Sequence, residues 1–333
     1  MHRYGRSGGT AGGVVSKFDC LYGTSHAVVA SDLRLFFDLA AVVLSEDDPA
    51  LDFPPEQRWL AGLYEKRRKY SPALRKGIAE SIVLLAVHGK DLFFDRTGIA
   101  CELEAGRLVR RLLTPMETRV LQANDRDLMA YAEASPEEFL SILEADLLQD
   151  EPQIFGLLKD VSGAPFGGGC TRAGLLWALE GLSWSTLTLD RAATVLARLS
   201  SVELNDNWSN KPFNSLAAIF RSWMPQTGAG LDHRLSLAKQ LTIRFPSVMW
   251  KVFLEEFDGG PRSGSYSHKP QWRNDGYGYG EPLREWGPAL EFCREVLDLM
   301  LAWRRTTLRT CSATLSVDSP RSATRVTKKG FGG

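Results

Sequence analysis

Apolar side chains recur every three or four positions along most of the chain, and this spacing predicts amphipathic helices. The clearest case is the segment from Ser135 to Leu148. Ser135 is a suitable N-cap, Pro136 fits the first turn, and Phe139 and Leu143 belong to one apolar face. We therefore predict a helix over this segment.

A helix is also predicted from Ser31, which would act as its N-cap. Its apolar residues at helical spacing include Leu35, Leu39, Val42 and Val43. These four side chains fall on one face, so we expect that face to be buried against the core.

Two helices are predicted to begin with proline. The first starts at Pro54 and Pro55 and ends in a basic last turn, which would complement the helix dipole. The second has Ser71 as its cap, Pro72 in its first turn and Gly89 as its stop signal. Further helices are predicted at 101–113 and 127–134, and in six segments after residue 172.

The complete pattern favours an all-α fold, because no run alternates between apolar and polar residues as a strand would. The helices that begin at Pro72, Pro136 and Pro246 are loosely similar, which favours a repeated unit over an irregular α domain. Every tryptophan except Trp59 lies after residue 172, and large aromatic residues suit a core of stacked helices. We predict an irregular helical-repeat stack of helix pairs, of the HEAT or solenoid type.

Glycine content and charge divide the chain into five parts. The 29–160 block holds 16 basic and 24 acidic residues, whereas the last 30 residues hold 7 and 1. The abrupt change at the end suggests a truncated or frame-shifted gene end. We expect a disordered Gly-rich N-terminus at 1–28, an acidic helical block at 29–160, a Gly-rich linker at 161–171, a Trp-rich helical block at 172–305 and a disordered basic tail at 306–333.

The overall composition indicates a globular protein with no net charge. Hydrophobic residues make up 44%, and 40 basic residues balance 40 acidic ones, which argues against a globally basic nucleic-acid binder. Five cysteines are spread singly, as is typical of a reducing compartment. We find neither a secretory signal nor an apolar stretch of membrane-spanning length, so we expect a cytoplasmic protein without a membrane partner.

The common motifs of catalysis and cofactor binding are missing from the sequence. There is no GxxxxGK[ST] or HExxH motif, and no CxxC pair that would indicate a zinc site. The Gly-rich segment at 161–171 lacks the lysine of a phosphate-binding loop, so a linker is favoured over a phosphate site. We therefore predict no enzyme activity, no cofactor and no metal, and we keep an enzyme whose site is assembled from distant residues as a minor alternative.

Two loops are distinctive. The asparagine-rich segment 203–215 favours an ordered corner between helices, pinned by Trp208 and Phe213. The segment 259–282 has no helical pattern, and loops of this length are usually functional or disordered. Its cations and aromatic rings could stack bases or bind a peptide. The favoured interpretation is a long loop whose aromatic rings pack back on the helices. The candidate binding residues are Arg262, Tyr266, His268, Lys269, Trp272, Arg273, Tyr277 and Tyr279.

One resemblance bears on function. The segments LLWALEGLSWSTLTLDRAATVLARLSSVE, WSNKPFNSLAAIFRSWMPQT and SHKPQWRND are similar to a helical region of large uncharacterised bacterial multidomain proteins. Some of these proteins look like ATPase-linked proteins encoded near phage-defence genes. The resemblance covers roughly residues 125–275, assigns no catalytic residue, and implies that this chain is a piece of a longer protein.

These observations favour a non-catalytic α-helical scaffold that binds a protein partner or a neighbouring domain. The alternative is a nucleic-acid-binding protein that uses the 259–282 loop and the basic tail, and such binding would weaken steeply with salt.

Overall fold

The computed structural model describes residues 16–162, 169–257 and 262–317. The structure is 65% helical. Within the described residues, extended structure is limited to β1 (Val161–Ser162) and β2 (Gly169–Cys170), which pair antiparallel with Val161 opposite Cys170. The predicted all-α class is confirmed.

The helices divide between the two halves of the chain. The first half contains α1 (Lys17–Thr24), α2 (Ala30–Leu44), α3 (Pro72–Gly89), α4 (Asp95–Thr97), α5 (Cys101–Leu113), α6 (Thr118–Ala123), α7 (Leu128–Ala134), α8 (Pro136–Leu147) and α9 (Ile154–Lys159). The second half contains α10 (Arg172–Leu182), α11 (Leu189–Ser200), α12 (Pro212–Phe220), α13 (Leu231–Arg244), α14 (Pro246–Glu256) and α15 (Trp286–Val317). Shorter 3₁₀ turns are η1 (Ser25–Ala27), η2 (Pro49–Asp52) and η3 (Pro55–Leu60), and η4 (Lys90–Phe94) is a π-helical turn.

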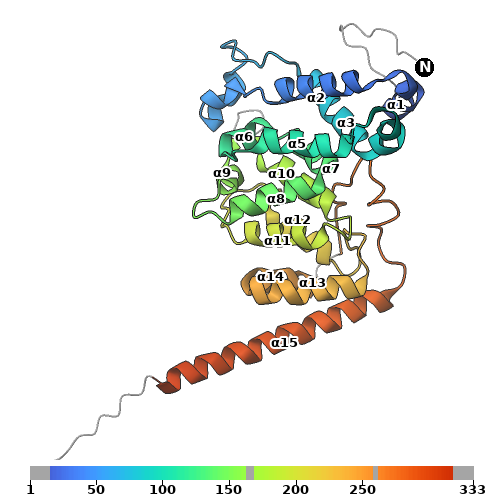
Figure 1. Ribbon diagram of the computed structural model, residues 1–333. Helices are drawn as coiled ribbons and strands as arrows, with labels where there is room; N and C mark the ends of the chain where they lie inside the picture. The colour runs from blue at the N-terminus through green and yellow to red at the C-terminus, as the bar shows by residue number, and fades with distance from the viewer. Residues whose placement is uncertain (1–15, 163–168, 258–261, 318–333) are drawn as a thin grey trace, which may run out of the picture.

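The helices are stacked in an order that broadly follows the chain (Figure 1). Helix α2 packs on α3 and α5, α5 packs on α8, and α8 packs on α11. Helices α11 and α12 then pack on α13 and α14, and α15 closes the far end of the stack. Helices α7 and α10 pack together in the middle, so one buried apolar cluster includes side chains from both sides of the 161–171 segment. Residues 163–168 of that segment lie outside the described residues.

Helix α3 begins where the sequence predicts, but Gly89 is not its stop signal, because the helical run continues through η4 and α4 to Thr97. The Ser71 hydroxyl accepts a hydrogen bond of 3.2 Å from the Leu74 amide, and Pro72 is the first helical residue. At the other end, a Cβ on Gly89 would lie 2.6 Å from the Cβ of Cys101. The glycine therefore allows α3 and α5 to approach closely, while the chain continues through η4 and α4 to Gly98, whose φ of 66° is left-handed.

The predicted buried face of α2 is largely wrong. Leu35, Leu39 and Val42 are 58%, 53% and 53% exposed, and of the four predicted side chains only Val43 is buried. The core instead receives Leu33, Phe37, Ala40, Ala41, Val43 and Leu44. Helix α2 carries apolar residues on two faces, and its contacts with α3 and α5 decide which face is buried.

Three other expectations are corrected at element boundaries. The predicted helix from Pro54 is only the 3₁₀ turn η3, and the chain then turns through Glu65 at a φ of 56°. Part of the expected disordered N-terminus forms helix α1, where the Ser16 hydroxyl accepts from the Asp19 amide. Helix α15 extends to Val317, into the expected tail. Residues 1–15 and 318–333 of the two expected disordered ends lie outside the described residues.

The corner at 203–215 is held by a fully buried arginine at the start of α10. Arg172 donates to the carbonyl oxygens of Leu158 at 2.7 Å and Asn210 at 2.5 Å. Its Nη2 also lies 2.6 Å from an Asp206 carboxylate oxygen, which holds the pKa of that carboxyl below its ordinary value. The guanidinium thus joins the end of α9 to the predicted ordered corner.

Helix α10 approaches the turn before α7 so closely that only glycine fits at position 174. A Cβ there would lie 1.8 Å from the backbone oxygen of Asp125. Gly181, on the same helix, has open space around its Cβ position. The two glycines therefore form a matched pair for a test of this contact.

We predict that Gly174→Ala lowers the free energy of unfolding by roughly 3 kcal/mol, because the backbone of the neighbouring turn must move. Gly181→Ala should raise it by up to about 1 kcal/mol through helix propensity. Chemical denaturation followed by circular dichroism measures both values. Equal effects at the two positions would contradict the close approach of α10 to this turn.

Candidate functional site

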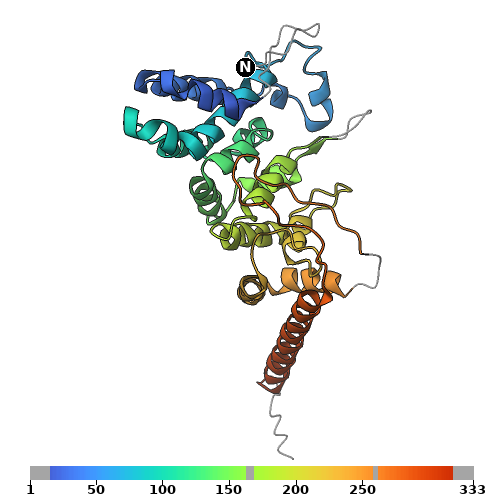
Figure 2. The same ribbon diagram turned by 90° about the vertical axis from the view of Figure 1, so that its right-hand side faces the viewer.

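The segment that the sequence predicts as a binding loop runs back along the stack. Its described part, residues 262–285, leaves the α14 end, reaches α7, and returns to α15 (Figure 2). We call residues 262–283 the strap. As predicted, the strap contains neither helix nor strand. Residues 259–261 of the predicted loop lie outside the described residues.

The strap is attached to the first half of the chain at Glu133 of α7. The backbone amides of Gln271, Trp272 and Arg273 donate to the Glu133 carboxylate at 3.1, 2.5 and 3.0 Å. The Arg273 side chain also donates from Nε to the Glu133 carbonyl oxygen at 2.7 Å. A single carboxylate thus satisfies three consecutive amides, and hydrogen bonds to a charged group are among the stronger ones.

A second attachment involves α10 and its C-terminal turn. Nδ1 of His268 lies 2.8 Å from Oε2 of Glu180, and the His268 ring stacks on Trp177 at 4.5 Å between centroids. The indole of Trp184 donates to the His268 carbonyl oxygen at 2.8 Å. The Lys269 ammonium lies 4.5 Å from the centre of the Trp184 ring. These contacts hold the middle of the strap against the second half of the stack.

The remaining predicted residues lie nearer the ends of the strap. Arg262 is 4.6 Å from the centre of the Trp286 ring, and the Tyr266 hydroxyl donates to Glu281 at 3.2 Å. Tyr277 is 87% exposed, and the Tyr279 carbonyl accepts from Lys269 at 2.5 Å. The eight predicted residues therefore do not converge on one surface. Most contact the protein itself, which supports the interpretation that the loop packs back on the helices.

A cleft of about 660 Å³ lies beneath the strap. Its walls come from η2, η3, α3, the turn between α6 and α7, and the strap. The strap contributes Lys269, Gln271 and Trp272, so the predicted loop does border a cavity. Apolar side chains such as Val83 and Met129 alternate in the lining with charges of both signs.

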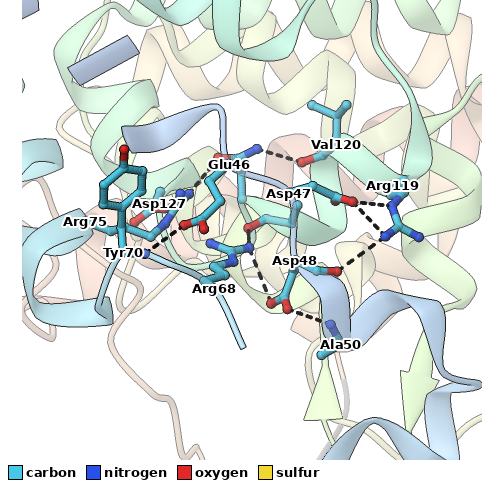
Figure 3. A network of polar contacts seen from close by, with 12 residues as sticks. Glu46, Asp47, Asp48, Ala50, Arg68, Tyr70, Arg75, Arg119, Val120 and Asp127 are labelled. Atoms are coloured by element: carbon cyan, nitrogen blue, oxygen red, sulfur yellow. Dashed lines mark hydrogen bonds and ion pairs between the residues drawn. The ribbon is translucent and has the colours of Figure 1, made fainter. Parts of the chain in front are cut away.

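The central charge of the cleft wall is Arg75, which is only 3% exposed (Figure 3). Its guanidinium donates to the backbone oxygens of Val43 at 2.7 Å and Leu44 at 3.2 Å, at the end of α2. It also donates to Asp127 at 2.9 Å and to Asn124 at 3.3 Å, in the turn before α7. Arg75 thus joins α2, α3 and α7 through one buried group.

The loop after α2 adds a more exposed part to this network (Figure 3). The Glu46 carboxylate accepts from the amides of Lys69 and Tyr70, at 3.1 Å for Tyr70. Asp48 accepts from the Ala50 amide at 2.9 Å, and Arg119 donates to Asp47 at 2.7 Å. These carboxylates fix the loop that forms one edge of the cleft.

Asp125 stands out among the cleft residues because burial raises its pKa from 3.8 to about 6. The neighbouring Arg126 opposes this shift. The turn that contains Asp125 also carries the backbone oxygen against which Gly174 packs. The carboxyl therefore changes charge near neutral pH at a tightly packed junction of the stack.

The chemistry available in the cleft is limited by these internal contacts. The one hydroxyl in its described lining belongs to Thr171, and that hydroxyl donates to Asp160 at 2.8 Å. Among the described residues, no group of three or more His, Cys, Asp or Glu side chains is placed to hold a metal ion. The described lining of the cleft combines apolar groups with charges that are largely paired within the protein.

Sequence reasoning missed Arg75, Asp127 and Glu133, which make the principal polar contacts of the site. A signal existed for Arg75, because it shares helical spacing with Ala79 and Val83 on the buried face of α3. A charge within such a stripe indicates a buried partner. Nothing local marks Glu133, since its partners are more than 130 residues away in the chain.

No protein-family model, curated protein or solved structure matches the chain. Of the helices in the described ranges, none combines the length and apolar character that a membrane crossing needs.

We predict that Arg75→Met lowers the free energy of unfolding by about 3–5 kcal/mol, because it leaves the Asp127 carboxylate buried without its partner. Arg119→Met is the matched control, since the exposed Arg119 pairs with Asp47 and Asp52 and should cost less than about 1 kcal/mol. Thermal and denaturant unfolding measure both. A similar small loss in the two variants would contradict the structural role of Arg75.

A second prediction concerns pH. Folding raises the pKa of Asp125 from 3.8 to about 6, so the folded protein favours the protonated carboxyl. The resulting contribution to stability is fully present below pH 3.8 and is lost as the pH rises through about 6. Asp125→Asn should therefore exceed the wild type in unfolding free energy by up to about 3 kcal/mol at pH 8, with the advantage fading toward pH 4. Urea titrations across this range test the prediction. A difference that does not vary with pH would refute it.

Proposed function

We propose that this chain is a non-catalytic helical scaffold that binds a protein partner or a neighbouring domain through the two end helices of its stack. The observation that carries the proposal is that α2 and α15 both turn apolar stripes outward. In stacked helical repeats, the outer faces of the terminal helices must be polar if they are to stay in water.

The outer stripe of α2 consists of Leu35, Leu39 and Val42, each more than half exposed. Their spacing of four and then three residues places them on one face, opposite the side chains that contact α5. Single exposed leucines are ordinary, but a contiguous apolar row on an end helix favours a binding surface.

The outer stripe of α15 consists of Trp286, Leu290, Leu297 and Leu301, which are 60%, 61%, 43% and 44% exposed. The same helix buries Phe292, Val296 and Met300 on another side. Helix α15 is therefore apolar on two sides, and the stack covers only one of them.

The proposal includes the finer assignment of a HEAT-like or solenoid-like stack. It is supported by the agreement between chain order and spatial order from α2 to α15 in Figure 1. In repeat proteins, each layer buries its apolar stripe on the next. The strap departs from that scheme, because it links α7 directly to a segment that follows α14.

The resemblance to helical regions of large ATPase-linked bacterial proteins is compatible with a scaffold that acts beside other domains. We propose a cytoplasmic location, which the free thiols of Cys20, Cys101, Cys170 and Cys293 support. Nucleic-acid binding is less well supported, because Lys269 and Arg273 of the strap already have partners within the protein.

Site-specific photo-cross-linking in cells that express the chain tests the proposal. A photoreactive residue at Leu39 or Leu297 should give discrete protein adducts. The same residue at Leu148 or Leu187, each 85% exposed outside the two stripes, should not. An absence of adducts at both stripe positions, or equal adducts at all four sites, would overturn the proposed function.

A further inference from the structure

We propose that a groove formed by α1, α2 and α3 binds a fatty acid, with the acyl chain in the groove and the carboxylate beside Lys17 and Lys76. This inference goes beyond the proposed function, because none of the outer-stripe residues of α2 and α15 lines the groove. It is carried by the volume and apolar lining of the groove, by a glycine within it, and by two lysines that share one carboxylate.

The groove has a volume of about 810 Å³, which is within the range of sites that hold small molecules. Helix α3 supplies the largest share of its lining, and α1, α2 and η4 supply most of the rest. These helices lie together at one end of the stack (Figure 1). Five apolar side chains of the lining are at least partly exposed: Leu21, Val28, Phe36, Leu74 and Ile78. The described part of the chain therefore leaves apolar surface open in this groove.

Gly77 widens the groove on the side of α3. It lies inside that helix, and a Cβ built on it would meet nothing within 4 Å outside its own stretch of helix. Gly89 and Gly174 are required by close neighbours, but no such neighbour requires a glycine here. Because glycine inside a helix is less stable than alanine, this position calls for another reason. A ligand chain lying against the backbone of α3 supplies one.

Two lysines at the groove share one carboxylate. Glu80 is only 8% exposed, Nζ of Lys17 contacts its Oε2, and Nζ of Lys76 lies 3.9 Å from its Oε1. The other acidic residue of the lining, Asp32, accepts from the Val29 amide at 3.0 Å and caps α2. Burial and the nearby Lys76 charge lower the pKa of Lys17, as expected where positive charge is not fully balanced. A ligand carboxylate would supply the missing negative charge.

The other polar groups of the lining favour a ligand with one charge and a long apolar part. The hydroxyls of Thr24 and Ser81 already donate to the carbonyl oxygens of Cys20 and Gly77, at 2.7 and 2.8 Å, within their own helices. The groove thus has few free hydrogen-bonding groups for a sugar or a nucleotide. The lysine side chains are 40% and 77% exposed, so the charged head of the ligand would remain near water while its chain is buried.

Fluorescence titration of the purified full chain with dansyl-undecanoic acid tests the site. We expect one saturable site with a micromolar Kd. Dodecanoate should displace the probe, and dodecanol should do so about fivefold more weakly, because the alcohol lacks the charge that pairs with the lysines. A wild-type chain that does not bind the probe saturably, or binds it without displacement by dodecanoate, would overturn the inference.

Two variants separate the contributions of shape and charge. Gly77→Leu should weaken probe binding at least about tenfold by filling the groove, without lowering the free energy of unfolding, because leucine is the better helix former. The matched control is Gly287→Leu, which adds the same side chain to open space on α15 and should bind as the wild type does. Lys76→Met leaves Lys17 paired with Glu80 and should bring dodecanoate and dodecanol close to equal affinity.

Unchanged binding in Gly77→Leu would refute the groove as the site, and an unchanged preference for dodecanoate in Lys76→Met would refute the role of the shared carboxylate. A partner protein in the groove is the competing occupant. A photoreactive residue at Leu74, which is 46% exposed there, distinguishes the two. Discrete protein adducts that dodecanoate does not suppress would overturn the fatty-acid site.

Discussion

Helix ends that are buried inside a stack leave backbone carbonyl groups without intrahelical donors, and the layers can assemble only if those groups are satisfied. Two arginines meet this requirement. Arg75 donates to the carbonyls that end α2 and to the turn before α7, and Arg172 donates to the end of α9 and to the 203–215 corner. Each planar guanidinium joins elements that are distant in sequence, so these two groups add directional contacts to the apolar packing between layers.

The strap changes how the stack holds together. In an open helical array each layer contacts only its neighbours, and the energetics are close to one-dimensional. Here the Glu133 carboxylate binds three amides of residues 271–273, so a segment that follows α14 contacts the first half of the chain. His268, Glu180 and Trp184 add attachments along the way. The strap thus has a structural role, and its conformation also sets one wall of the cleft.

The sequence predicted helix caps and boundaries well, but it predicted poorly which face of a helix is buried. The cap at Ser71 and the boundaries of α5, α7 and α8 follow from short-range chemistry, so the pattern was sufficient. The burial of α2 was misjudged because two apolar stripes share that helix, and only its packing partners distinguish them. Contacts such as Glu133 with the strap could not be predicted, because residues more than a hundred positions apart leave no periodic signal. The cleft is formed by such contacts, so it could not be predicted from the hydrophobic pattern either.

The Glu133 attachment has a mechanical consequence. Layers α8 to α14 lie within a loop that is closed by covalent backbone on one side and by the Glu133 hydrogen bonds on the other. Tension applied between the two end helices would otherwise peel the layers apart one after another. With the loop closed, the force divides between two parallel paths, and the layers inside it are shielded until the carboxylate releases its amides. A protein pulled from α2 and α15 should therefore yield first outside this loop.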